Sequence, residues 1–135
     1  MSGRRYIGPY SSQPVGSMAD ISLHTQSAAI AATGIIGGVA GTGLWRVSYF
    51  HTLDNSGAGG TMQLVIKGTN EGNSPTGTYS APELRVSVAG NQSGSFVISS
   101  NGTADITYEV DFLNVTVGAL AYSLRIVAEQ LSAQG

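Results

Sequence analysis

Three acidic residues in the last third of the chain are the side chains best spaced for chemistry. Asp105, Glu109 and Asp111 are separated by even numbers of residues, so an extended strand would place them on one face. Glu109 and Asp111 would lie about 6.6 Å apart along such a strand, a separation that suits two carboxylates acting on a glycosidic bond. That face is the polar one, however, and no apolar surroundings are predicted that would raise a carboxyl pKa. We therefore favour a solvated stripe that faces Arg46 or Arg125 on neighbouring strands.

The remaining candidates for catalysis or metal binding are also weak. His24 and His51 fall on separate predicted strands, outside any metal-ligand spacing or Ser/His/Asp arrangement, and are interpreted as structural or surface residues. Asp54-Asn55 and residues 70–73 offer oxygen ligands for calcium, but neither follows the Asp-x-Asp-x-Asp-Gly spacing. We expect no catalytic residue, no metal and no cofactor, and we expect that the protein is not an enzyme.

Composition narrows the class of protein further. A length of 135 residues suits one domain with a sizeable core. Because the chain has no cysteine, packing must stabilise this core without disulfides. Only 10% of the residues are charged and the net charge is −2, so no basic stripe for nucleic acid is expected. The most apolar window, residues 28–39, is too short for a membrane helix, and no export signal is recognised at the N-terminus. A soluble protein with a weakly charged surface is expected, which favours contact with neighbouring subunits.

Alternation of apolar and polar residues between glycine- and asparagine-rich turns predicts the elements that carry these side chains. The period of two describes antiparallel sheets with one packed and one solvated face. Eight strands are expected, at residues 21–26, 29–36, 43–53, 61–67, 83–88, 95–99, 105–111 and 119–129. The chain is thus predicted to be all-β, an antiparallel two-sheet β-sandwich like a jelly roll, with a simpler sandwich or barrel as the alternative.

The same alternation predicts which side chains form the core. The inward-facing sets are Trp45/Val47/Tyr49/Leu53, Met62/Leu64/Ile66, Leu84/Val86/Val88, Phe96/Ile98, Ile106/Tyr108/Val110 and Tyr122/Leu124/Ile126. Four of these aromatic residues are of a type that sugar-binding proteins use on exposed faces. Since Trp45, Tyr49, Tyr108 and Tyr122 all fall on the inward sets, we assign them to the core.

Residues 1–18 lack either period and are interpreted as an extended N-terminal arm, with the sandwich domain at residues 19–135. The arm is richer in aromatic residues than a disordered tail, although a frayed terminus is the alternative. Arginine and tyrosine are frequent among the residues that dominate interface energies. The predicted contacts with a partner are therefore Arg4, Arg5, Tyr6, Ile7 and Tyr10.

Much of the chain resembles a family of small structural proteins of tailed-bacteriophage virions. The likeness is a pattern of strands and turns in residues 22–33, 43–50, 61–66, 94–98, 105–108 and 121–129, among them Trp45-Arg46-Val47 and Thr107-Tyr108. It implies a jelly-roll or tumour-necrosis-factor-like module, commonly trimeric, that decorates a capsid or forms a tail or fibre knob. The family offers no motif residues that could be transferred as a site.

The arm favours the decoration role, because an extended segment adds contact area to a shell at low mass. We expect a capsid decoration (cement) protein on the virion exterior, assembled in the host cytoplasm and bridging capsomers. Its partners would be the major capsid protein and itself, as a homotrimer. Deleting residues 1–18 is predicted to leave a folded oligomer that no longer stays on the shell. The alternatives are a tail or fibre knob and a carbohydrate-binding module for host attachment.

Overall fold

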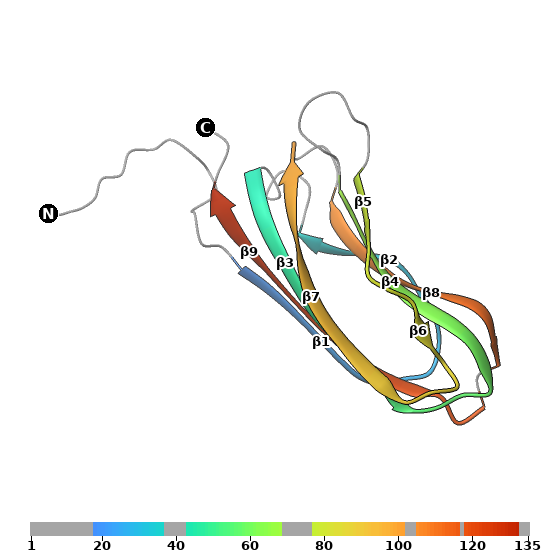
Figure 1. Ribbon diagram of the computed structural model, residues 1–135. Helices are drawn as coiled ribbons and strands as arrows, with labels where there is room; N and C mark the ends of the chain where they lie inside the picture. The colour runs from blue at the N-terminus through green and yellow to red at the C-terminus, as the bar shows by residue number, and fades with distance from the viewer. Residues whose placement is uncertain (1–17, 37–42, 69–76, 102–104, 117, 133–135) are drawn as a thin grey trace, which may run out of the picture.

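The protein is an all-β sandwich of two antiparallel sheets, described by a computed structural model over residues 18–36, 43–68, 77–101, 105–116 and 118–132 (Figure 1). Within these ranges no helix is long and apolar enough to span a membrane. The nine strands are β1 (Met18–Gln26), β2 (Ile30–Ile36), β3 (Gly43–Asn55), β4 (Gly59–Gly68), β5 (Gly77–Ser80), β6 (Leu84–Arg85), β7 (Gly90–Ser100), β8 (Ile106–Thr116) and β9 (Ala121–Ser132).

The order of the strands is that of a jelly roll. The four-stranded sheet has the order β1-β9-β3-β7, and the five-stranded sheet has the order β2-β8-β4-β5, with β6 also paired to β4. Apart from β4, β5 and β6, which lie in one sheet, each strand is followed by a strand of the opposite sheet. Such crossing connections build the two interlocked Greek keys of a jelly roll. The predicted fold class is therefore confirmed.

The predicted strand at residues 83–88 is the main error of local detail. Only Leu84–Arg85 pairs with β4 there, and β5, which was not predicted, pairs with the far half of β4. β5 and β6 thus occupy one edge position that is interrupted around Pro82, a residue that lacks the N–H needed for a continuous ladder. Val86 is buried as expected, whereas Val88 is 57% exposed beyond the end of the pairing.

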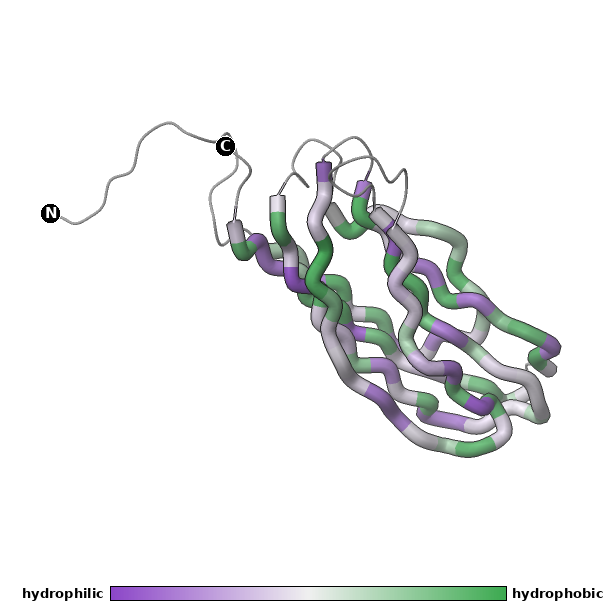
Figure 2. The backbone as a smooth tube through the Cα atoms, turned by 45° about the horizontal axis from the view of Figure 1, so that its top comes forward, coloured by the Kyte–Doolittle hydropathy of each residue, from purple (hydrophilic) through white to green (hydrophobic). Residues whose placement is uncertain are grey.

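The period-two assignment of the core is confirmed for the long strands. Trp45, Tyr49, Tyr108 and Tyr122 are all buried between the sheets, together with the aliphatic residues of β3, β4, β8 and β9. Apolar and polar residues alternate along these strands in Figure 2. Each fully buried large side chain contributes roughly 1.5–3 kcal/mol relative to exposure, so the sandwich is stabilised by packing without disulfides.

β7 begins earlier than its sequence indicates. Asn91 and Gly94 have the composition of a turn, yet both pair with β3, opposite Thr52 and Tyr49. A Cβ on Gly94 would lie 2.8 Å from the Tyr49 hydroxyl oxygen and 3.1 Å from its Cζ. The glycine therefore makes room for the Tyr49 ring, which stacks on Phe96 with ring centroids 5.6 Å apart.

Candidate functional site

The five residues predicted to contact a partner, Arg4, Arg5, Tyr6, Ile7 and Tyr10, lie outside the described residues. The described chain begins with β1, which forms one edge of the four-stranded sheet. In the described part of the protein, β1 pairs only with β9, over Met18 to Gln26. One row of its backbone N–H and C=O groups consequently faces away from the sheet.

The acidic stripe lies on the outer face of the five-stranded sheet. Glu109 of β8 forms an ion pair with Lys67 of the neighbouring β4, with a Nζ–Oε1 distance of 3.1 Å. The prediction that Arg46 or Arg125 faces this stripe is wrong, because both arginines belong to the other sheet. Sequence spacing defines one face of a strand but carries no information about which strand lies beside it.

Two of the three carboxyl groups of this stripe, those of Glu109 and Asp111, are hydrogen-bonded to each other. The hydrogen bond with Asp111, followed by that with Lys67, lowers the pKa of Glu109. Burial and the neighbouring Glu109 raise the pKa of Asp111. The two carboxyl groups of a glycosidase stand about 5 Å or more apart, whereas Glu109 and Asp111 share a hydrogen bond. Their geometry is that of a surface ion-pair network.

The two histidines have opposite environments although their strands belong to the same sheet. His24 of β1 is exposed and lies 3.2 Å from the Ser22 hydroxyl through its Nε2. His51 of β3 is 0% exposed, and its ring meets the Tyr122 ring edge-on at 5.4 Å. Burial lowers the pKa of His51 to about 4. His51 is thus a structural core residue, and His24 is a surface residue.

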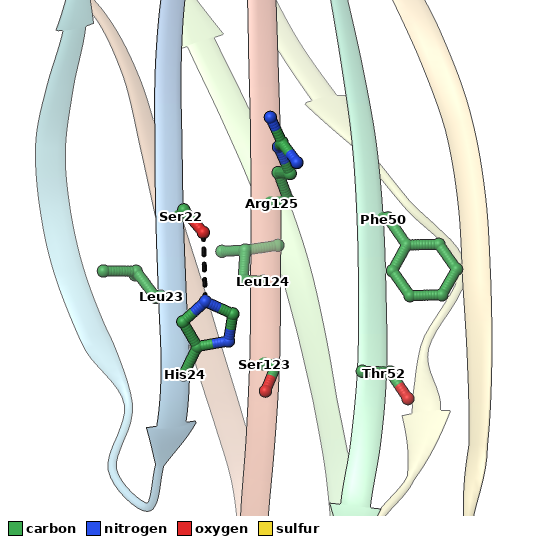
Figure 3. Close-up of a pocket in the computed structure, with 8 residues that line it drawn as sticks. All are labelled: Ser22, Leu23, His24, Phe50, Thr52, Ser123, Leu124 and Arg125. Carbon is green, nitrogen blue, oxygen red and sulfur yellow. Dashed lines mark hydrogen bonds between the residues drawn. The ribbon is translucent and has the colours of Figure 1, made fainter.

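A hollow of ≈ 400 Å³ opens on the outer face of the four-stranded sheet (Figure 3). Its lining comes from three adjacent strands, β1, β9 and β3, and consists of Ser22, Leu23, His24, Phe50, Thr52, Ser123, Leu124 and Arg125. A second depression of ≈ 190 Å³ adjoins it and shares Phe50 and Arg125. The hollow and the second depression are thus continuous on this face.

The hollow arises because small side chains lie beside large ones at paired positions of neighbouring strands. Ser22 and Phe50 both lie opposite Arg125, and Thr52 lies opposite Ser123 on the central strand β9. Ser123 is too small to fill the space between its neighbours. The Phe50 ring lies beside β3 with its flat side toward the viewer in Figure 3, and the residue is 48% exposed.

Charges on this face are largely paired. The Arg125 guanidinium donates to both carboxylate oxygens of Asp20, at 2.8 and 3.3 Å, and this contact raises the pKa of Arg125. Arg46 is paired with Glu129 at 3.1 Å. The Asp54 carboxylate accepts a hydrogen bond of 2.6 Å from the Ser123 hydroxyl. The hollow is thus lined by hydroxyl groups, an imidazole and a paired guanidinium beside one exposed aromatic ring.

Sequence reasoning did not single out this hollow. Phe50 falls on the outward face of β3 with Arg46, Ser48 and Thr52, all polar. A large aromatic residue on the solvated side of an alternating strand is the signal that could have indicated it. The depth of the hollow could not be inferred, because it depends on which residues of β1 and β9 lie beside Phe50.

Comparison with known proteins gives distant likenesses. No family model and no curated protein sequence matches the chain. Among solved structures, a chain with the N-terminal CBM22-1 and GH10 modules of Clostridium thermocellum xylanase 10B, complexed with xylohexaose, is 9% identical, with a TM-score of 0.42 over 87% of this chain. A protein of the infectious bursal disease virus Gt strain is 13% identical, with a TM-score of 0.41 over 99% of this chain.

The third likeness is to the Bacillus endospore appendages that form disulfide-linked pili, at 16% identity and a TM-score of 0.38 over 97% of this chain. The chain spans 100% of that structure's length, but only 27% of the xylanase chain and 42% of the virus chain. Two of these three structures thus come from a virus particle and from spore pili.

Proposed function

We propose that the chain is a non-enzymatic structural protein of a virion, a decoration (cement) protein that binds the capsid exterior as a homotrimer. Its partner would be the major capsid protein, and it would stabilise the shell by bridging capsomers. The resemblance of its strand and turn pattern to phage virion proteins supports this role, and so does the jelly-roll order of its strands. The observation that carries the proposal is the position of β1.

β1 is an edge strand, and the segment that contains Arg4, Arg5, Tyr6, Ile7 and Tyr10 leads directly into it. An edge strand presents main-chain donors and acceptors that a neighbouring chain can pair with. Contacts made by the arm would therefore continue into the edge of the sheet, and would fix the sandwich on the shell. Arginine and tyrosine in the arm would supply the side-chain part of that contact.

The weak charge of the surface also supports assembly. Only 10% of the residues are charged, and apolar side chains such as Met18 on β1 and Leu113 on β8 are exposed. Removing such a surface from water costs little desolvation of charged groups, so close packing between subunits is favourable. A closed threefold arrangement would bury the same surface on each copy.

The test uses the full chain with Arg4, Arg5, Tyr6, Ile7 and Tyr10 all replaced by serine. Light scattering should give the mass of a trimer for this variant and for the natural chain, and both should unfold at the same temperature. Co-sedimentation with capsid shells that lack the protein should be lost in the variant. Val88→Ser, which changes an exposed apolar residue elsewhere, should bind shells like the natural chain.

Undiminished shell binding by the arm variant would contradict the role of the arm, and a monomeric natural chain would contradict the trimer. Copy number then separates decoration from a tail or fibre knob. A decoration protein should be present in numbers comparable to the major capsid protein, measured by densitometry of purified particles. A knob should be present in a few copies per particle.

A further inference from the structure

We propose that the hollow on the outer face of the four-stranded sheet binds a neutral sugar, with the Phe50 ring as its stacking platform. This inference goes beyond the role on the particle and does not depend on it. The site is built from β1, β9 and β3, the three strands whose register places Ser22, Arg125 and Phe50 in one row.

The size and shape of the hollow suit one sugar residue with room for a second. Its volume of ≈ 400 Å³ lies within the roughly 300–1,000 Å³ of small-molecule sites. The adjoining depression of ≈ 190 Å³ continues past Phe50 and Arg125. A planar aromatic face with an exposed fraction of 48% offers an apolar surface to the C–H groups of a pyranose ring.

The polar lining matches ligand hydroxyl groups, which both donate and accept hydrogen bonds. The hydroxyls of Ser22, Thr52 and Ser123 have the same dual capacity, and the His24 imidazole has one donor and one acceptor nitrogen when neutral. In Figure 3 Ser22 and His24 lie on β1, Ser123 lies on β9 and Thr52 lies on β3. A ligand that carries hydroxyl groups around an apolar ring face can therefore satisfy both parts of the lining.

Charge argues for a neutral ligand over an anionic one. Arg125, the cation that lines the hollow, is already held by two hydrogen bonds to Asp20. The Asp54 carboxylate, which accepts a hydrogen bond from the lining residue Ser123, adds negative charge close by. A phosphate or a uronic acid would have to displace the Asp20 contact and would be repelled by Asp54. A neutral sugar would leave the Asp20 contact in place and would not be repelled by Asp54.

The experiment is saturation-transfer NMR of the full chain with the methyl glycosides of glucose, galactose, mannose and N-acetylglucosamine, beside glucuronic acid and glucose 6-phosphate. At least one neutral glycoside is expected to bind with a dissociation constant of about 1 mM, as befits a small ligand on an open site. In amide correlation spectra of the protein, addition of this glycoside should shift the signals of His24, Ser123 and Arg125. The two anionic compounds should bind at least about tenfold more weakly.

Substitution of the platform tests the site itself. Phe50→Ala should weaken the bound glycoside at least about tenfold, and Phe50→Trp should retain it because the stacking surface is kept. Val97→Ala, which removes an exposed apolar side chain from the other edge of the same face, should leave binding unchanged. Unchanged amide dispersion in the spectra verifies that each variant is folded.

Three results would overturn the inference: no binding of any neutral glycoside, unchanged binding by Phe50→Ala, or preference for the anionic compounds. The particle role is tested separately in the same samples. Phe50→Ala should still co-sediment with shells, and the arm variant should still bind the sugar. Loss of one property without the other therefore shows which of the two proposals fails.

Discussion

Acid should destabilise this protein through His51, a buried residue on the inner face of β3. In the described part of the chain neither ring nitrogen has a hydrogen-bond partner, and the Oε1 of Gln92, directly across on β7, also lacks one. The Tyr122 hydroxyl donates to the Ala28 carbonyl at 2.6 Å, so it is engaged away from the imidazole. A protonated ring would therefore lie in the core with no acceptor within hydrogen-bond distance among the described residues.

The pKa values set the direction and the size of the effect. The pKa of His51 is about 4 in the folded protein against an ordinary value of 6.5, so the unfolded chain binds the proton more tightly. The free energy of unfolding must then fall as the pH drops below 6.5, and this loss is complete below the folded pKa. It amounts to about 2 kcal/mol between pH 7 and pH 5, and to about 3 kcal/mol when complete.

Urea denaturation at pH 7, 6, 5 and 4 measures this effect when the natural chain is compared with His51→Leu. Leucine fills the same inner position without a titrating group and removes no hydrogen bond found in the described residues. The variant should be at least as stable at pH 7 and should lack about 2 kcal/mol of the loss seen at pH 5. His24→Leu, on the exposed side of β1, should keep the natural pH dependence. Equal slopes for the natural chain and His51→Leu would refute the reasoning.

Two glycine substitutions test the packing with matched controls. Gly60→Ala should destabilise the protein by about 2–4 kcal/mol, because Gly60 has a φ of +87° and an added Cβ would lie 2.5 Å from backbone oxygens. The control is Gly59→Ala, whose added Cβ would have no atom within 4 Å. Equal shifts of the urea midpoint in the two variants would contradict this prediction. Gly94→Ala should cost about 1–3 kcal/mol by displacing the Tyr49 ring, whereas Gly90→Ala on the same strand should change stability by less than about 1 kcal/mol. Near-ultraviolet circular dichroism follows the tyrosine, and an unaltered spectrum for Gly94→Ala would count against the displacement.

Side-chain alternation made the inner face of the sandwich predictable. Trp45, Val47, Tyr49 and Leu53 share a parity along β3, and all four are buried. The same parity places His51 inward, although its polarity suggested a surface position as readily. Since successive residues of any strand point to opposite faces, position in the strand outweighed residue type.

Contacts across strands were not predictable in the same way. Glu109 was expected to face an arginine, but β8 lies beside β4, so its partner is Lys67. Arg125 meets Asp20, a residue 105 positions away. The hollow on the outer face likewise needs Phe50, Arg125 and Ser22 in one row, which only the pairing of β1, β9 and β3 creates.

The sequence by itself determined an all-β sandwich, its buried faces and its weak surface charge, because alternation and composition are properties of the local chain. Only the tertiary structure decided which strands are neighbours, and hence the ion pairs, the depth of the hollow and the surroundings of His51. These depend on long-range pairing, where many strand orders bury the same apolar residues and only one brings these particular side chains together.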